Sequence, residues 1–177
     1  TLNTFGVKGA LFYAVNDILL KAALFIIVGL IIYVSGVKYI QKCGLINKYP
    51  LLGWTYFIVV LSLAGVPPFS GFYGKALIIK GLVANNNTFI AILVALSGLV
   101  VFYSLIKIFL NVFYDNINKS LILKPLPKGV QIPLIAIVAI ALIIGVSSNL
   151  LDGIFDKGIQ MVLNPQHYID LVLKKGA

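Results

Sequence analysis

The chain has 177 residues, of which 60% are hydrophobic and only 11% are charged, and its mean hydropathy is +1.05. A soluble domain of this length needs a far more polar surface, so the composition indicates an all-α membrane protein. The net charge is +9, and every basic residue is a lysine. These lysines fall mainly between apolar stretches, as the flanks of membrane helices do, which argues against a nucleic-acid partner.

The cysteine and histidine content excludes further classes of site. Cys43 and His167 are the single residues of their kinds. One cysteine cannot form a disulfide within the chain, and one histidine with no cysteine or glutamate beside it does not make a metal site. Neither a glycine-rich phosphate loop nor a catalytic serine–histidine arrangement is present. The sequence thus predicts no metal, no cofactor and no catalytic site on this chain.

Four membrane-scale segments follow one another, over about residues 9–36, 50–84, 88–114 and 130–146. A helix needs roughly 20 apolar residues to cross the hydrocarbon core, so we read residues 1–147 as four transmembrane helices. Residues 148–177 place apolar residues at helical spacing among polar ones, which predicts an amphipathic helix on the membrane surface. An apolar helix begins within eight residues of Thr1, so we expect the chain to start inside a longer polytopic protein.

The second segment is too long for one straight crossing and is interrupted near its middle. Two consecutive prolines remove two backbone donors there and clash with the preceding turn. We therefore predict a discontinuous helix, whose break comprises Gly65, Pro67, Pro68, Gly71 and Gly74. Lipid cannot satisfy the freed backbone groups, so the break must face protein or a water-filled cavity.

The lysine distribution predicts how the chain lies in the membrane. Loops 37–49 and 115–129 carry six lysines, against two near the membrane on the opposite side. We therefore expect these loops to be cytoplasmic and both ends of the chain to be extracytoplasmic, in a multi-pass protein of the cell membrane. Aromatic residues near the cytoplasmic ends of the first two helices, Trp54 and Tyr56 among them, fit an interfacial belt.

Charged residues at membrane depth are the candidate functional residues. Asp17 and Lys21 are four residues apart in the first helix, which places the acid and the base on one face in the favourable order. A structural ion pair that fixes helix packing is one interpretation. A proton relay is favoured, because ionisable residues inside membranes are usually functional. Asn16 lies beside the pair and is expected to help line a polar path.

Lys75 is the strongest of these signals, because it follows the two prolines by seven residues. Half-helix ends at membrane depth expose unpaired backbone groups, which is how transporters build ion sites. A snorkelling lysine that reaches the headgroups is the alternative, and it is the preferred interpretation for Lys80. Lys107, in the last third of the third helix, is a candidate relay residue for which snorkelling remains equally open.

Two runs of sequence, residues 12–25 around Asp17 and Lys21 and residues 63–75 across the break, resemble the antiporter-like membrane subunits of multisubunit Na+/H+ antiporters and respiratory complex I. Within this family the chain is most similar to the MrpD or MnhD type of subunit. The resemblance implies a fourteen-helix protein with two inverted five-helix repeats, of which this chain would form the last four helices. It also implies that Lys75 matches the lysine of the second broken helix, which lies on the proton path, and that Lys21 matches the lysine of the preceding helix. Relatives often carry histidine where this chain has Asn16, and asparagine cannot titrate.

These observations leave three hypotheses. The preferred one is a membrane subunit of a cation/proton (Na+/H+) antiporter, which moves protons along Asp17, Lys21 and Lys75. Its expected partners are other membrane subunits, and its expected ions are protons and Na+. The second is a proton-pumping subunit of an NADH:quinone oxidoreductase or membrane-bound hydrogenase, in which the same residues would serve. The third is an inactive remnant with a structural role only.

Overall fold

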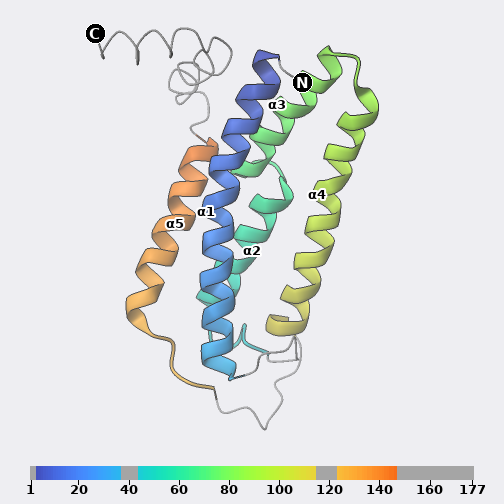
Figure 1. Ribbon diagram of the computed structural model, residues 1–177. Helices are drawn as coiled ribbons and strands as arrows, with labels where there is room; N and C mark the ends of the chain where they lie inside the picture. The colour runs from blue at the N-terminus through green and yellow to red at the C-terminus, as the bar shows by residue number, and fades with distance from the viewer. Residues whose placement is uncertain (1–2, 37–43, 115–122, 147–177) are drawn as a thin grey trace, which may run out of the picture.

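The computed structural model describes residues 3–36, 44–114 and 123–146, and every regular element in these ranges is a helix, as predicted. In chain order these are α1 (Thr4–Ser35), α2 (Pro50–Ala64), α3 (Ser70–Ala84), α4 (Thr88–Phe109), the π-helical turn η1 (Leu110–Tyr114) and α5 (Lys128–Val146). Figure 1 shows α4 and α5 on opposite sides of the group formed by α1, α2 and α3. The predicted amphipathic tail, residues 148–177, lies outside the described residues.

Two of the helical stretches, Thr4–Ser35 and Thr88–Tyr114, are long and apolar enough to cross a membrane, and two shorter apolar helices accompany them, Pro50–Ala64 and Gly129–Gly145. Helix α1 begins five residues before the predicted position. The side chain of Asn3 caps it by accepting a hydrogen bond from the Gly6 N–H at 2.8 Å. It ends at Gly36, which adopts a left-handed conformation with φ of 68° and donates its N–H to the Ile32 carbonyl.

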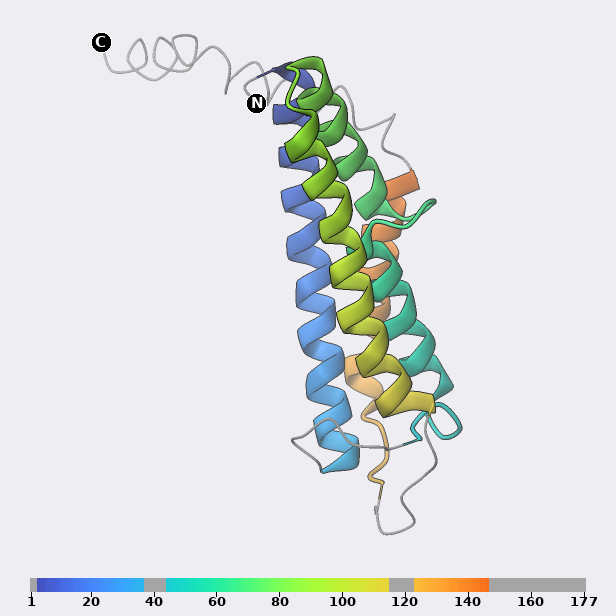
Figure 2. The same ribbon diagram turned by 90° about the vertical axis from the view of Figure 1, so that its right-hand side faces the viewer.

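The predicted discontinuous helix consists of α2 and α3, separated by residues 65–69. Gly65 ends α2 in a left-handed conformation with φ of 80°, which glycine adopts without steric cost. Pro67 and Pro68 are exposed, and the loop that contains them projects from the bundle (Figure 2). The two half-helices therefore meet inside the protein, while the prolines lie at its surface.

Small residues bring α1 and α3 into close antiparallel contact. A Cβ atom on Gly9 would lie 2.7 Å from the backbone nitrogen of Ile78, and one on Gly81 would lie 2.7 Å from the Gly6 nitrogen. Only glycine permits backbones to approach this closely, as at many membrane helix interfaces. This contact fixes the level at which residues of α1 face the break.

An aromatic core joins α2 to the end of α4. The Tyr56 ring stacks on Phe109 with centroids 6.0 Å apart and contacts Phe113 at 5.5 Å, while its hydroxyl donates to the Leu105 carbonyl at 3.1 Å. Tyr56 is fully buried, so its assignment to an interfacial belt is wrong: the helix rotation points it at α4. Trp54 is exposed, as that assignment requires.

Candidate functional site

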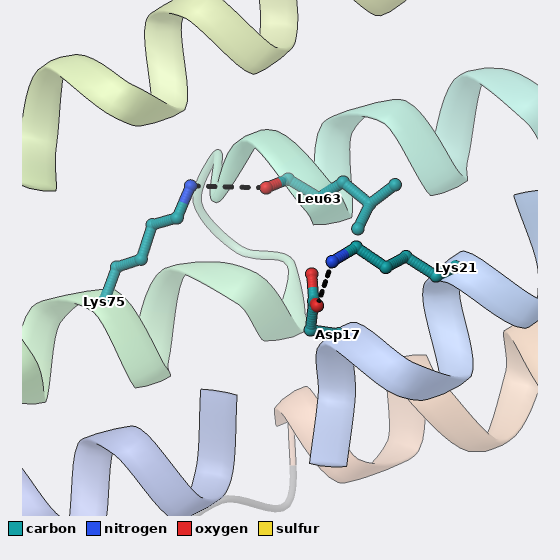
Figure 3. A network of polar contacts seen from close by, with 4 residues as sticks. All are labelled: Asp17, Lys21, Leu63 and Lys75. Atoms are coloured by element: carbon teal, nitrogen blue, oxygen red, sulfur yellow. Dashed lines mark hydrogen bonds and ion pairs between the residues drawn. The ribbon is translucent and has the colours of Figure 1, made fainter. Parts of the chain in front are cut away.

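Lys75 lies inside the bundle, at the junction of the two half-helices. Its residue exposure is 8%, and its Nζ donates to the Ala64 carbonyl at 2.8 Å and to the Leu63 carbonyl at 3.2 Å. Figure 3 shows the side chain reaching from α3 to the end of α2. The lysine is thus buried among backbone groups rather than directed toward the headgroups, so the snorkelling alternative is wrong for this residue in the described structure.

The two carbonyls that receive Lys75 are available because α2 ends there. The last carbonyls of any helix have no intrahelical donor. At this end the N–H of Gly65 serves the carbonyls of Leu61 and Ser62, which leaves those of Leu63 and Ala64 for the ammonium. The C-terminal end of a helix also carries a partial negative charge, which favours a cation. The break therefore supplies two backbone carbonyls as acceptors for the buried Lys75 ammonium, so no carboxylate is needed to bind it.

Three glycines allow this arrangement. A Cβ atom on Gly65 would lie 2.9 Å from Cδ of Lys75, and one on Gly71 would overlap the Ser62 carbonyl oxygen. On α4, a Cβ atom on Gly98 would lie 2.6 Å from the Ala64 carbonyl oxygen and 3.1 Å from the Lys75 Nζ. Gly65 and Gly71 belong to the predicted break. Gly98 does not, and it brings α4 against the ammonium group.

Helix α1 covers the site from another side. A Cβ atom on Gly74 would lie 2.9 Å from Cβ of Tyr13, and the Tyr13 ring centroid lies 5.7 Å from the Lys75 Nζ. A cation at this distance is attracted to the negative face of an aromatic ring. One turn further along α1 is Asp17, which is therefore level with the first turn of α3.

Asp17 forms an ion pair with Lys21, with 2.6 Å between Oδ2 of the acid and Nζ of the base. The Asp17 side chain is 19% exposed, and that of Lys21 is 59% exposed. In Figure 3 this pair and Lys75 approach the end of α2 from two sides. The structure thus brings together three of the four predicted charged residues around the break.

Lys107, the fourth, lies elsewhere. It is exposed and lines a surface pocket of about 520 Å³ with Tyr103, Ser104, Ile108 and Asn111. It is nine residues beyond Gly98, or about 13 Å along α4 at about 1.5 Å per residue. Lys107 therefore lies away from the break. Lys80 is also exposed, and its Nζ lies 4.2 Å from the Phe5 ring centroid.

A cleft of about 520 Å³ leads away from the break between α3 and α4. Lys75 and Lys80 line it together with Ala64, Gly65, Phe72, Ala76, Ile79, Val83 and Ala95. Within the described ranges, no three His, Cys, Asp or Glu side chains gather as a metal site would require. The chemistry available at the break is that of an ammonium group and a carboxylate, which can exchange protons, and of backbone carbonyls, which accept hydrogen bonds.

The family described as "NADH:quinone oxidoreductase/Mrp antiporter, TM" matches residues 1–101, which contain α1, the break and Lys75. The chain belongs to this family. A Na(+)/H(+) antiporter subunit of the D type from Bacillus subtilis (strain 168) is 37% identical over 175 residues, which cover 96% of this chain and 35% of that protein. The antiporter subunit mnhD2 of Staphylococcus haemolyticus (strain JCSC1435) is 36% identical over 180 residues, which cover 98% and 36%. The resemblance to this type of subunit is confirmed, and the chain spans about a third of the length of these relatives.

Two solved structures share the fold of this chain. The match to the Mrp complex from Dietzia sp. DQ12-45-1b covers 97% of this chain and 40% of the matched chain, with a TM-score of 0.89 and 20% sequence identity. The match to respiratory complex I from Thermus thermophilus with bound Aureothin covers 82% of this chain and 33% of the matched chain, with a TM-score of 0.61 and 24% sequence identity. At these identities the likeness supports the arrangement of the helices.

Several residues of this family member's site have no simple signal in the sequence. The Leu63 and Ala64 carbonyls are backbone groups, which every residue has. Gly98 is one small residue in an apolar helix, and only its packing against Ala64 gives it a role. Asn16, by contrast, is predicted from the sequence to line a polar path, and it is 1% exposed inside the bundle.

Proposed function

We propose that this chain forms part of the membrane subunit of a multisubunit Na+/H+ antiporter and carries a section of its proton path. One observation carries the proposal: the Lys75 ammonium is buried at the helix break, bound to two free carbonyls of α2, with the Asp17–Lys21 pair approaching the same break. The names of the relatives with 36–37% identity support the type of transporter.

The hydrogen bonds of Lys75 suit it to gain and lose a proton. An ammonium group has three N–H donors, and Lys75 uses two of them on the carbonyls of Leu63 and Ala64. When the third proton leaves, the neutral amine keeps two N–H bonds for the same two carbonyls and gains a lone pair that can accept the next proton. Deprotonation therefore leaves no buried carbonyl without a donor, a loss that would cost about 1–3 kcal/mol for each group.

The Asp17–Lys21 pair supplies the neighbouring step. A proton bound at Lys75 and a proton shared by the pair repel one another through their charges, so a change at one position alters the affinity of the other. Lys21 is the more exposed partner and is the natural point of contact with the next part of the path. The ion exchanged against the proton would bind elsewhere in the complex, with partner membrane subunits.

We further infer the membrane arrangement. Helix α1, the α2–α3 unit, α4 with η1, and α5 would form four crossings. Loops 37–49 and 115–129 would be cytoplasmic and both ends of the chain extracytoplasmic, with residues 148–177 on the membrane surface. The flanking segments of both loops lie at one end of the bundle, opposite the turn between α3 and α4 (Figure 1), which supports placing the loops on one side.

A proton-pumping subunit of an NADH:quinone oxidoreductase is the second candidate. The family description names both kinds of complex, and the fold likeness extends to respiratory complex I. The same residues would then move protons, and the redox sites would lie on other chains. Purification of the complex separates the two, since redox subunits accompany the chain only in the second case.

The test replaces the ammonium group in the assembled complex. Lys75→Met keeps an apolar side chain of similar length, and Lys80→Met is the matched control on the same helix. In everted membrane vesicles we expect Na+-dependent proton movement to be lost with Lys75→Met and retained with Lys80→Met, at equal amounts of complex. Wild-type transport by Lys75→Met would contradict the proposal.

A further inference from the structure

Helix α4 and the turn η1 that continues it carry most of their polar residues on one stripe. Positions 97, 100, 104, 107, 111 and 114 follow one another at alternating spacings of three and four residues, and five of these six residues are polar: Ser97, Ser104, Lys107, Asn111 and Tyr114. The rest of this apolar 27-residue stretch has only two polar residues, Thr88 and Tyr103. Alternating spacings of three and four keep residues on one face of a helix, which is the pattern by which two helices pack along their length.

The stripe faces away from the rest of the bundle. Helix α4 packs on α2 through Gly98, which lies against the Ala64 carbonyl. Lys107 is nine residues further along, which is about two and a half turns at about 3.6 residues per turn, so it lies on the opposite side of α4. Five of the six stripe residues are exposed and Asn111 is half-buried. No other described helix lies in front of α4 when the bundle is seen from this side (Figure 2).

Lys107 and Asn111 lack partners within the described residues, unlike the two serines of the stripe. The hydroxyls of Ser97 and Ser104 donate to carbonyls of their own helix at 2.7 and 2.9 Å. Lys107 and Asn111 make neither a hydrogen bond nor an ion pair with the described part of the chain, and they line the same surface pocket. An ammonium group and an amide on the outer side of a membrane helix therefore need acceptors and donors from elsewhere.

The chain offers no carboxylate on α4 to pair with Lys107. Residues 85–114 contain neither Asp nor Glu, and Asp115 is eight residues from Lys107 in the sequence, twice the spacing of a helical ion pair. Other lysines at membrane depth have acceptors in this chain: Lys21 pairs with Asp17, and Lys75 binds two carbonyls. Among these charged residues, Lys107 is the one that the described residues leave without a partner.

Exposure to lipid does not account for the stripe. Lys107 alone could snorkel, because it is seven residues, or about 10 Å, from the end of η1. The side chains of Ser97, Ser104 and Asn111 are too short to reach the headgroups in this way. A facing helix accounts for the whole stripe, because serines permit a close approach, asparagine forms hydrogen bonds between helices, and a carboxylate neutralises the lysine.

We propose that this stripe is the docking surface for a membrane-spanning helix of a partner subunit, and that the partner helix carries an Asp or Glu residue level with Lys107. The pocket of about 520 Å³ beside Lys107, whose described lining residues all belong to α4 and η1, would receive that carboxylate. The Asn111 amide can donate to the same group. The inference rests on the proposed function only in that it places the chain among other membrane subunits.

Contact along the stripe is tested by photo-cross-linking in the assembled complex. A benzophenone amino acid replaces either Val100, on the stripe, or Leu99, beside it. The two residues are both 65% exposed and point about 100° apart around the helix. We expect Val100, and not Leu99, to yield an adduct with one membrane helix of a partner subunit, and that helix to contain an Asp or Glu residue. Adducts with lipid alone, equal adducts from both positions, or a cross-linked helix without an acid would overturn the proposal.

The charge is tested by Lys107→Met, with Lys80→Met as the control. At equal amounts of chain in the membrane, we expect Lys107→Met to lower co-purification of the partner subunit roughly tenfold, because the partner's carboxylate loses its counter-charge. Transport per assembled complex should fall much less than in Lys75→Met. A snorkelling lysine predicts normal assembly, since methionine suits an apolar helix at least as well. Assembly of Lys107→Met equal to that of Lys80→Met would therefore overturn the proposal.

Charge reversal identifies the partner residue. Lys107→Glu should assemble even less than Lys107→Met, because two carboxylates would then face one another. Replacing the acid of the cross-linked helix by lysine should restore assembly of Lys107→Glu. Rescue by Asp115→Lys instead would assign the pair to this chain and overturn the docking surface, and so would the absence of any rescue by the cross-linked helix.

The docking surface and the proton path fail in different experiments. Normal assembly of Lys107→Met, together with loss of transport in Lys75→Met, would overturn the docking surface alone. Normal transport by Lys75→Met would overturn the proposed proton path, while a rescued Lys107→Glu complex would still establish the docking surface.

Discussion

Gly98 is expected to be as important for transport as a charged residue, although it has no side chain. In Gly98→Ala the new Cβ would lie 2.6 Å from the Ala64 carbonyl oxygen, whereas ordinary contacts begin at 3.4 Å. The carbonyl or α4 must therefore move by about 0.8 Å. That carbonyl is the nearer acceptor of the Lys75 ammonium, at 2.8 Å, so the displacement acts directly on the proposed proton carrier.

The magnitude follows from two effects. Overpacking a core by one carbon costs typically about 1–3 kcal/mol, and a hydrogen bond from a charged group contributes about 1.5–3 kcal/mol. If the displaced Ala64 carbonyl loses part of this hydrogen-bond energy with Lys75, transport should fall roughly 10- to 100-fold, since each 1.4 kcal/mol is about tenfold in rate.

The assay is Na+-dependent proton movement in everted vesicles, normalised to the amount of assembled complex. Gly29→Ala is the matched control, because a Cβ atom there meets nothing within 4 Å. We expect Gly29→Ala to transport at the wild-type rate. If Gly98→Ala does the same at equal complex amounts, α4 does not position the ammonium group and the reasoning is refuted.

Three further predictions use the same vesicles and a measurement of assembled complex. Asp17→Asn should reduce assembly more than Asp17→Asn with Lys21→Met, because the single change leaves an ammonium group at membrane depth without its partner; equal assembly of the two would contradict this. Gly71→Ala should prevent assembly, because its Cβ would overlap a backbone carbonyl of α2 that cannot rotate away; a normally assembled Gly71→Ala complex would show that the half-helices can separate. Lys107→Met should lose much less transport than Lys75→Met, because Lys107 lies away from the break, and an equal loss would place it on the path.

Local chemistry explains what the sequence could predict about the fold. The break is visible because two adjacent prolines disrupt a helix wherever they occur, and no knowledge of neighbouring helices is needed. Lys75, Asp17 and Lys21 are visible because a charge inside an apolar segment is costly and therefore informative. Their common location follows from the break itself, which provides free carbonyls at the depth of the charged residues.

What the sequence could not predict depends on how the helices pack. Whether Lys107 faces the break or the surroundings is set by the rotation of α4, which presents Gly98 to the site and leaves Lys107 exposed. Tyrosine is a residue type common at membrane interfaces, but Tyr56 packs against α4. Its hydroxyl donates to a backbone carbonyl there, and two aromatic neighbours cover its ring. Ser62 and Ser70 look like ordinary helix residues until the crossing of α2 and α3 shows that their hydroxyls lack partners.

The central claim is that Lys75 gains and loses a proton while bound to the end of α2. The most direct measurement is nuclear magnetic resonance of the complex with ¹⁵N-labelled lysine side chains, with the Lys75 signal assigned by its absence in Lys75→Met. The account predicts that the Lys75 nitrogen changes from ammonium to amine within the pH range in which the complex transports protons. A signal that remains ammonium throughout that range, in an active complex, would contradict it.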